Sequence, residues 1–278
     1  LLVLLSMAVV LTIVLSVVAR SVSDISLSSR EENALRAFSA AEAGIEKALS
    51  QGASIISESI GAEGAIINAT VSNFASGATN FVFPQDIISG DTATIWFVNH
   101  DDTGSLVCSA QYPCFTGSEM KVCWGEAGTP SNQATTPAVE VTVLYTTSPG
   151  DYSTMKIART AIDPYTSRSP ANNFSAPDAG TCTINGKTFQ FQKTINFSSL
   201  GIGASVYNTQ NGLQMTRIRM IYNSLSPQPV GVDSGVGILP TQGKKIESTG
   251  TSGESSRKVE VYRLFPDLPP IFDAAVFS

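Results

Sequence analysis

The chain opens with LLVLLSMAVVLTIVLSVVA, residues 1–19, a stretch without a single charged side chain. About 20 apolar residues are enough for a helix to cross the hydrocarbon core of a bilayer. This stretch can therefore span a membrane or fill the dry centre of a protein polymer, and it decides how the rest of the sequence is interpreted.

A cleavable secretory signal does not account for this stretch. Such a signal carries a basic segment, a shorter apolar run and a small-residue cleavage site. No Lys or Arg precedes the run, and the helical pattern continues past Arg20. Because the sequence starts at Leu1 rather than at Met, we expect that a leader has been removed or that the sequence is part of a longer chain.

The next stretch, residues 21–50, has the pattern of an amphipathic helix. Its apolar residues recur at steps of three and four, which places them on one helical stripe. They are Val22, Ile25, Leu35, Phe38, Ala41, Ile45, Ala48 and Leu49. Gly44 makes this helix about 1 kcal/mol less stable than Ala would at the same position, and tertiary packing must offset that cost. The sequence predicts one helix over residues 1–50, roughly 75 Å long, whose stripe supports the following domain.

Residues 51–278 change from the helical period to the period of two that is typical of strands. The clearest predicted strands are Ala93–Val98, Met120–Trp124, Ala138–Tyr145, Met155–Ile162, Lys187–Phe197, Met215–Tyr222 and Lys258–Phe265. Within Lys187–Phe197, the residues Phe189, Phe191, Ile195 and Phe197 share one face, as in an antiparallel sheet with one buried side. The predicted fold class is α+β, a long N-terminal helix packed on an antiparallel β-rich domain.

Other parts of residues 51–278 give weaker signals. Residues 53–83 show no sustained period, so they can form a loop, a short strand or a small helix. Clusters of Gly, Pro, Ser and Asn predict turn-rich loops. These loops are Thr146–Asp151, Ser167–Gly180, Ser224–Gly237 and Thr249–Ser256.

The composition excludes some kinds of partner. The formal net charge is −6 and the pI is about 4.8. A nucleic-acid-binding surface needs clustered Lys and Arg, so nucleic acid is not an expected partner. No internal repeat and no cofactor motif is visible, since the glycine pairs near 201 and 235 lack the Lys-Ser/Thr of a P-loop. No cofactor is expected.

Four cysteines, Cys108, Cys114, Cys123 and Cys182, form the next pattern. In a domain carried across a membrane, an even number predicts two disulfides. Zinc sites use closely spaced pairs, whereas these gaps are five, eight and fifty-eight residues, so we expect no metal site. Three pairings are possible; we favour Cys108–Cys114 together with Cys123–Cys182.

Candidate catalytic and modification sites are few. The single histidine, His100, precedes Asp101-Asp102, a combination that acid–base chemistry can use. The local pattern favours a polar turn after a strand, so we expect no catalytic residue and no enzyme activity. Three Asn-X-Ser/Thr triplets begin at Asn68, Asn173 and Asn196, and these are possible glycosylation sites.

Three segments resemble a known family. Residues 36–49, RAFSAAEAGIEKAL, follow the uncharged segment and are similar to the helices of type IV pilins, in particular the minor-pilin-like branch. The segments Ile246–Gly250 and Arg257–Val261 are similar to the last strands of the same branch. The residues between show no readable motif of the family.

The resemblance implies a filament subunit. A prepilin peptidase would process it, the cytoplasmic membrane would hold it, and the pilus assembly machinery would extract it into a helical homopolymer at the cell surface. The filament would serve adhesion, motility or surface interaction. Many pilins carry Glu at mature position five, where this chain has Leu5, a departure that suits a minor pilin. The assembly helix would use Leu1, Leu5, Ser6, Val10, Val14, Val18, Leu35, Phe38 and Ile45.

The alternatives are a minor pilin at the tip of a pilus or secretion system and a single-pass membrane-anchored binding module. In the binding module, the helix would end near Arg20 and a flexible linker would follow. Its ligand would contact an aromatic patch of Tyr112, Phe115 and Trp124. The absence of Pro from residues 21–50 favours the long helix.

Overall fold

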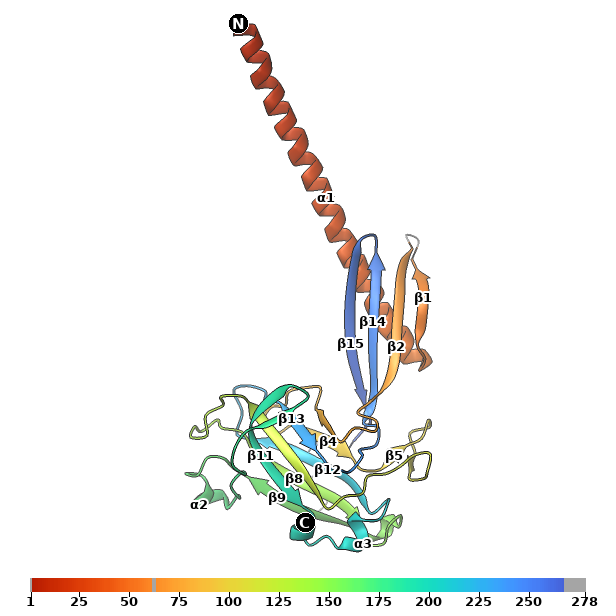
Figure 1. Ribbon diagram of the computed structural model, residues 1–278, viewed down its shortest axis with the longest axis vertical. Helices are drawn as coiled ribbons and strands as arrows, with labels where there is room; N and C mark the ends of the chain where they lie inside the picture. The colour runs from red at the N-terminus through yellow and green to blue at the C-terminus, as the bar shows by residue number, and fades with distance from the viewer. Residues whose placement is uncertain (1, 62–63, 268–278) are drawn as a thin grey trace. The chain divides into compact units, whose positions relative to one another are not determined.

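The computed structural model describes residues 2–61 and 64–267 and divides the chain into two compact units (Figure 1). Unit 1 consists of residues up to 72 together with 244–263, and unit 2 consists of 73–243 together with the residues from 264. The sequence placed all of 51–278 in one domain. The division differs because two late strands return to pair with early ones, a long-range connection that no local pattern reveals.

Unit 1 is one long helix with one sheet. The helix α1 (Leu2–Gln51) is followed by β1 (Ile55–Ile60) and β2 (Ala65–Phe74), and the late strands are β14 (Gly243–Ser252) and β15 (Ser255–Leu264). The strand order is β1-β2-β14-β15. The stretch left open at 53–83 therefore contains strands, and Thr249–Ser256 is strand except for a tight turn at Gly253-Glu254, so the loop predicted there is wrong.

The predicted long helix is confirmed over its described part. It runs unbroken from Leu2 to Gln51, past Arg20, without the flexible linker that a simple membrane anchor would need. It ends at Gly52, whose φ of +66° is the left-handed conformation that favours glycine, and the Gly52 amide donates to the Ala48 carbonyl at 2.8 Å.

Unit 2 contains two larger sheets and a two-stranded one. The first sheet has the order β10-β11-β7-β13-β3 and the second β4-β12-β8-β9, and each pairing within them is antiparallel. The strands are β3 (Asn80–Val82), β4 (Thr92–Trp96), β5 (Asn99–His100), β6 (Leu106–Val107), β7 (Glu119–Glu126), β8 (Ala138–Thr146), β9 (Met155–Ile162), β10 (Cys182–Ile184), β11 (Lys187–Asn196), β12 (Leu213–Ile221) and β13 (Val230–Asp233). Short helical turns are η1 (Tyr152–Thr154), α2 (Ser169–Asn172), η2 (Ser198–Leu200) and α3 (Ala204–Tyr207). The α+β class is as predicted.

The two larger sheets of unit 2 share one apolar core, as in a β-sandwich. Trp124 of β7 and Ile218 of β12 are both fully buried in it. The predicted face of β11 is correct, because Phe189, Phe191, Ile195 and Phe197 are all buried.

The predicted loop Ser224–Gly237 is wrong in its second half, which contains β13. Gly231 sits between Val230 and Val232 in this strand, and a Cβ there would lie 2.8 Å from the Phe189 ring. Gly231 weakens the strand pattern in the sequence, yet the close packing at this position requires a glycine.

Candidate functional site

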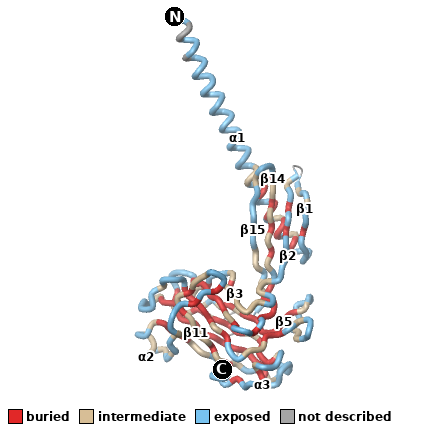
Figure 2. Tube along the Cα trace, viewed as in Figure 1, coloured by how far each residue is buried: buried red, intermediate tan, exposed pale blue. Residues whose placement is uncertain are grey.

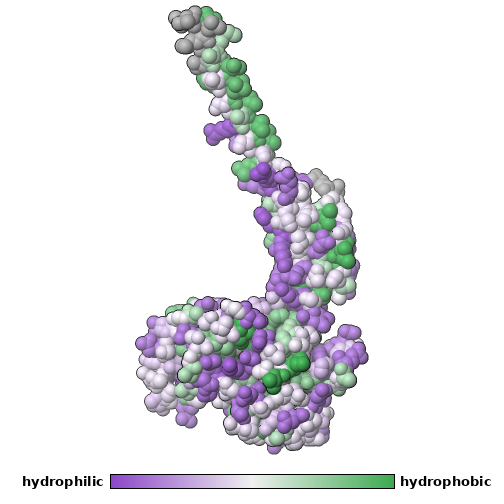
Figure 3. Space-filling view, in the orientation of Figure 1, coloured by the Kyte–Doolittle hydropathy of each residue, from purple (hydrophilic) through white to green (hydrophobic). Residues whose placement is uncertain are grey.

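The described N-terminal half of α1 is exposed (Figure 2), and it carries large apolar side chains. Twelve of them over residues 3–27 are between 52% and 72% exposed. They are Val3, Met7, Val10, Leu11, Ile13, Val14, Leu15, Val17, Val18, Val22, Ile25 and Leu27. Figure 3 shows the hydrophobic surface that they form. An 18-residue stretch of α1 has a mean hydropathy of 1.9, so by length and composition α1 is apolar enough to cross a membrane, the one such helix among the described residues.

The predicted assembly residues differ in how exposed they are in the structure. Val10, Val14 and Val18 are exposed on the apolar half, and Ser6 is exposed with its hydroxyl donating to the Val3 carbonyl at 2.9 Å. Leu1 lies outside the described residues, and the side chain of Leu5 is also outside what the structure describes.

The C-terminal half of α1 buries a stripe of small residues against the sheet of unit 1. The stripe consists of Ala37, Ala40, Ala41, Gly44, Ile45 and Ala48. Ile45 therefore packs within unit 1 instead of facing a neighbour. Of the predicted stripe, Ala41, Ile45 and Ala48 are buried as expected and Leu49 packs partly buried beside them. Its other four members are exposed and do not carry the sheet: Val22 (62%), Ile25 (67%), Leu35 (70%) and Phe38 (44%). The correction is physical: hydrophobicity favours the larger side chains, whereas close helix–sheet packing selects the smaller ones.

Strand β14 meets this stripe with small residues of its own. Its buried positions alternate as Ile246, Ser248, Gly250 and Ser252. A Cβ at Gly250 would overlap the Ala37 carbonyl oxygen and lie 2.5 Å from the Ala41 nitrogen. A Cβ at Gly44 would overlap the Ser248 hydroxyl. Gly250 thus lets the backbones of strand and helix come into contact, and Gly44 makes room for the Ser248 side chain; this packing offsets the conformational cost of Gly44.

We expect Gly250→Ala to loosen unit 1 selectively. The added methyl group has no room, and overpacking of this kind costs about 1–3 kcal/mol. Hydrogen exchange of the β14 amides should therefore be faster by about 5- to 150-fold. Thr249→Ala, at the next position on the opposite face of the strand, is the control. Unchanged exchange in Gly250→Ala would contradict the close approach.

The opposite face of β14 and β15 carries alternating charges. Lys258 and Lys245 both contact Glu247, at 2.6 and 3.2 Å, and Lys245 also contacts Glu260 at 3.0 Å. Hydrogen bonds from Lys258 and then Lys245 hold the pKa of Glu247 at about 2. This face of the hairpin therefore stays charged and hydrated, in contrast to the face against α1.

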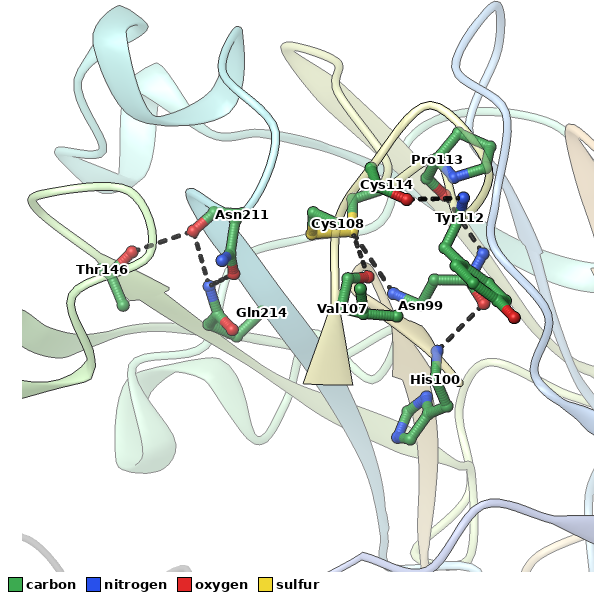
Figure 4. The surroundings of a disulfide bond; sticks show 11 residues. Asn99, His100, Val107, Cys108, Tyr112, Pro113, Cys114, Thr146, Asn211 and Gln214 are labelled. Atoms are coloured by element: carbon green, nitrogen blue, oxygen red, sulfur yellow. Dashed lines mark hydrogen bonds between the residues drawn. A yellow bond between two sulfur atoms is a disulfide. The ribbon is translucent and has the colours of Figure 1, made fainter. Parts of the chain in front are cut away.

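Two disulfides lie in unit 2, one of them shown in Figure 4. They join Cys108 to Cys114 and Cys123 to Cys182, the pairing favoured from the sequence. The first closes a short loop next to β5, where the Asn99 side chain donates to the Pro113 carbonyl at 3.4 Å. The second links β7 to β10 and is buried in the core. Disulfides persist in compartments outside the cytoplasm.

We expect Cys182→Ser to destabilise unit 2 by about 2–5 kcal/mol, because its partner lies 59 positions away and the crosslink closes a long loop. Both tryptophans, Trp96 and Trp124, lie in unit 2, so fluorescence during urea unfolding reports on this unit alone. Cys108→Ser, which opens the loop closed over six positions, should cost less. If the urea concentration at the midpoint of unfolding were unchanged in Cys182→Ser, the prediction would be contradicted.

His100 lies in an aromatic cluster. Its ring stacks on Phe265 at 3.8 Å and meets the edge of Trp96 at 4.7 Å. Burial lowers the pKa of His100, partly opposed by the Asp101 charge, and the neutral ring is therefore favoured. The Asp101 carboxylate accepts from Thr103 and Ser105 in a turn. These contacts describe a packing role for His100.

The aromatic patch suggested for a binding module does not form. Phe115 and Trp124 are fully buried in the core of unit 2, and only Tyr112 of the three is partly exposed. Alternating sequence patterns do not separate exposed aromatics from core aromatics, which explains the error.

The three candidate glycosylation residues differ in exposure. Asn68 on β2 and Asn173 at the end of α2 are exposed, and Asn196 at the end of β11 is half-buried. The side-chain oxygens of Asn68 and Asn196 already accept hydrogen bonds from the backbone amides of Ser57 and Ser198. Among the described residues, no group of three or more His, Cys, Asp or Glu gathers to hold a metal ion.

Comparison with known proteins found no matching family model, no matching curated protein and no matching solved structure. The functional argument therefore depends on α1 and the sheet that supports it.

Proposed function

We propose that this protein is a structural subunit of a type IV pilus-like helical filament at the cell surface. In this proposal α1 holds the subunit in the cytoplasmic membrane, a prepilin peptidase and the pilus assembly machinery act on it, and copies then associate through α1. The role is structural and assigns no chemistry to His100. Two disulfides in unit 2 agree with a location outside the cytoplasm.

The observation that supports the proposal most strongly is how far exposed apolar side chains extend along α1. From Val3 to Phe38 an α-helix extends about 50 Å, whereas the hydrocarbon core of a bilayer is about 30 Å thick. A membrane can cover the first 20 residues but not Leu35 and Phe38 as well, and both are exposed. Neighbouring copies in a filament would cover the entire length.

The resemblance in the sequence has a structural counterpart. Two of the three segments that resemble minor pilins, residues 36–49 and 246–250, contact each other in unit 1 through Gly44, Ser248 and Gly250. Their shared function in the proposal is to fix the supporting sheet on the helix. The subunit would serve adhesion, motility or surface interaction, as part of a shaft or at the tip of a pilus or secretion system.

Electron microscopy of surface filaments, with antibodies against unit 2, tests the proposal. We expect labelled filaments with a core of packed helices. A variant without residues 2–19 should give none, since the apolar half is then missing. Dispersed monomers in detergent, with no labelled filament at the cell surface, would contradict the proposal.

A further inference from the structure

A groove of about 490 Å³ lies within unit 1, between α1 and the β1–β2 pair. Its apolar walls are Leu35 and Ala40 of α1, Ile60 of β1 and Ala65 of β2. Small residues, Ser39 and Gly61, also line it and let a backbone approach closely.

The charge of the groove is nearly neutral. Arg36 is its one charged lining residue among those described, and its guanidinium contacts the Glu32 carboxylate at 2.6 Å. A charged peptide thus finds no free counter-charge there. An uncharged, apolar helix is the occupant that these walls match.

The chain itself contains such a helix. On the apolar half of α1, Val3, Met7, Val10, Val14 and Val17 follow the spacing of three and four by which helices fill hydrophobic grooves. At roughly 60–120 Å² per aliphatic side chain, these five residues, each 52–72% exposed, offer on the order of 200–400 Å² on this face of the helix. This is below the roughly 800 Å² per partner of a stable pairwise interface, so the groove would be one of several contacts that a polymer repeats along α1.

We infer that the groove seats the apolar half of α1 from a second copy of this chain. The inference rests on the proposed function and deepens it by naming the surface on which a neighbour packs. A helix cannot fold back on itself, and Val10 lies about 40 Å along α1 from Leu35, so the occupant comes from another copy.

A photo-crosslinking amino acid at position 60, in place of Ile60, tests the inference in assembled filaments. We expect mass spectrometry to find crosslinks to peptides from residues 2–20. The same probe at Ser59, the neighbouring exposed residue on the opposite face of β1, should give none. Crosslinks from position 60 only to other segments, or none, would overturn the groove as the docking surface.

A matched pair of substitutions gives a second measurement. Ile60→Asp should lower filament yield at least tenfold, because it places a carboxylate where an apolar helix docks. Ser59→Asp should leave the yield within about twofold. Hydrogen exchange of β2 checks that Ile60→Asp still folds. If the wild-type protein forms filaments and Ile60→Asp assembles equally well, the groove inference fails alone; if the wild type forms none, the proposed function fails with it.

Discussion

Val10→Asp is expected to abolish filament assembly. Val10 is exposed at the middle of the apolar half of α1, and a filament would bury it among neighbouring helices. An aspartate at the centre of a membrane-spanning helix costs about 3 kcal/mol on insertion, and a carboxylate buried without a partner among packed apolar helices is disfavoured for the same reason. Because every subunit carries the change, the loss repeats along the polymer.

The measurement is filament yield by electron microscopy, together with the amount of subunit in the membrane fraction. The membrane fraction separates failed assembly from failed insertion, since the same carboxylate also disfavours the bilayer. Val10→Leu retains an apolar side chain of similar size and should assemble normally. A normal yield of Val10→Asp filaments would count against burial of this residue.

Arg168→Met is expected to destabilise unit 2 by about 3–5 kcal/mol. The Arg168 guanidinium donates to both oxygens of the fully buried Asp163 carboxylate, at 2.9 and 2.8 Å. It also donates to the backbone carbonyls of Ala134 and Thr136, at 2.7 and 2.8 Å, and lies 4.0 Å over the Tyr222 ring. Methionine preserves much of the aliphatic packing but leaves the buried carboxylate without its cation.

Tryptophan fluorescence during urea unfolding of the full chain measures this loss in unit 2. Arg159→Met is the control, because Arg159 and Glu140 form a partly exposed pair at 3.9 Å whose removal should cost no more than about 1 kcal/mol. If Arg168→Met lowered the free energy of unfolding by less than about 1 kcal/mol, other groups would have to stabilise the buried Asp163 carboxylate, which would contradict the prediction.

The sequence predicts elements where burial and hydrophobicity coincide. Phe189, Phe191 and Ile195 alternate in β11, and their strand was predicted with the correct buried face. In β14 the same alternation is made of Ser248, Gly250 and Ser252, which hydrophobic periodicity does not detect. Part of that strand was therefore assigned to a loop.

The same limit explains why the stripe predicted on α1 is only partly correct. Large residues such as Leu35 and Phe38 dominate a hydrophobic pattern, and they were assigned to the face that carries the domain. The buried stripe begins with small residues, Ala37 and Ala40, and continues through Ala41, Ile45 and Ala48, which the predicted stripe did include. The spacing of these residues is visible in the sequence, but its meaning depends on Gly250 and Ser248 about 200 residues later.

The division of the chain has a mechanical consequence. In the described part, the backbone passes between the two units three times, at 72–73, 243–244 and 263–264, and these crossings belong to β2, β14 and β15. The three strands are neighbours in one sheet. The first two crossings are the covalent routes that hold residues 73–243, whereas the third leads only to the residues from 264. Tension applied to residues 73–243 is thus shared by two parallel covalent routes, and a protease cut at either one leaves the other intact.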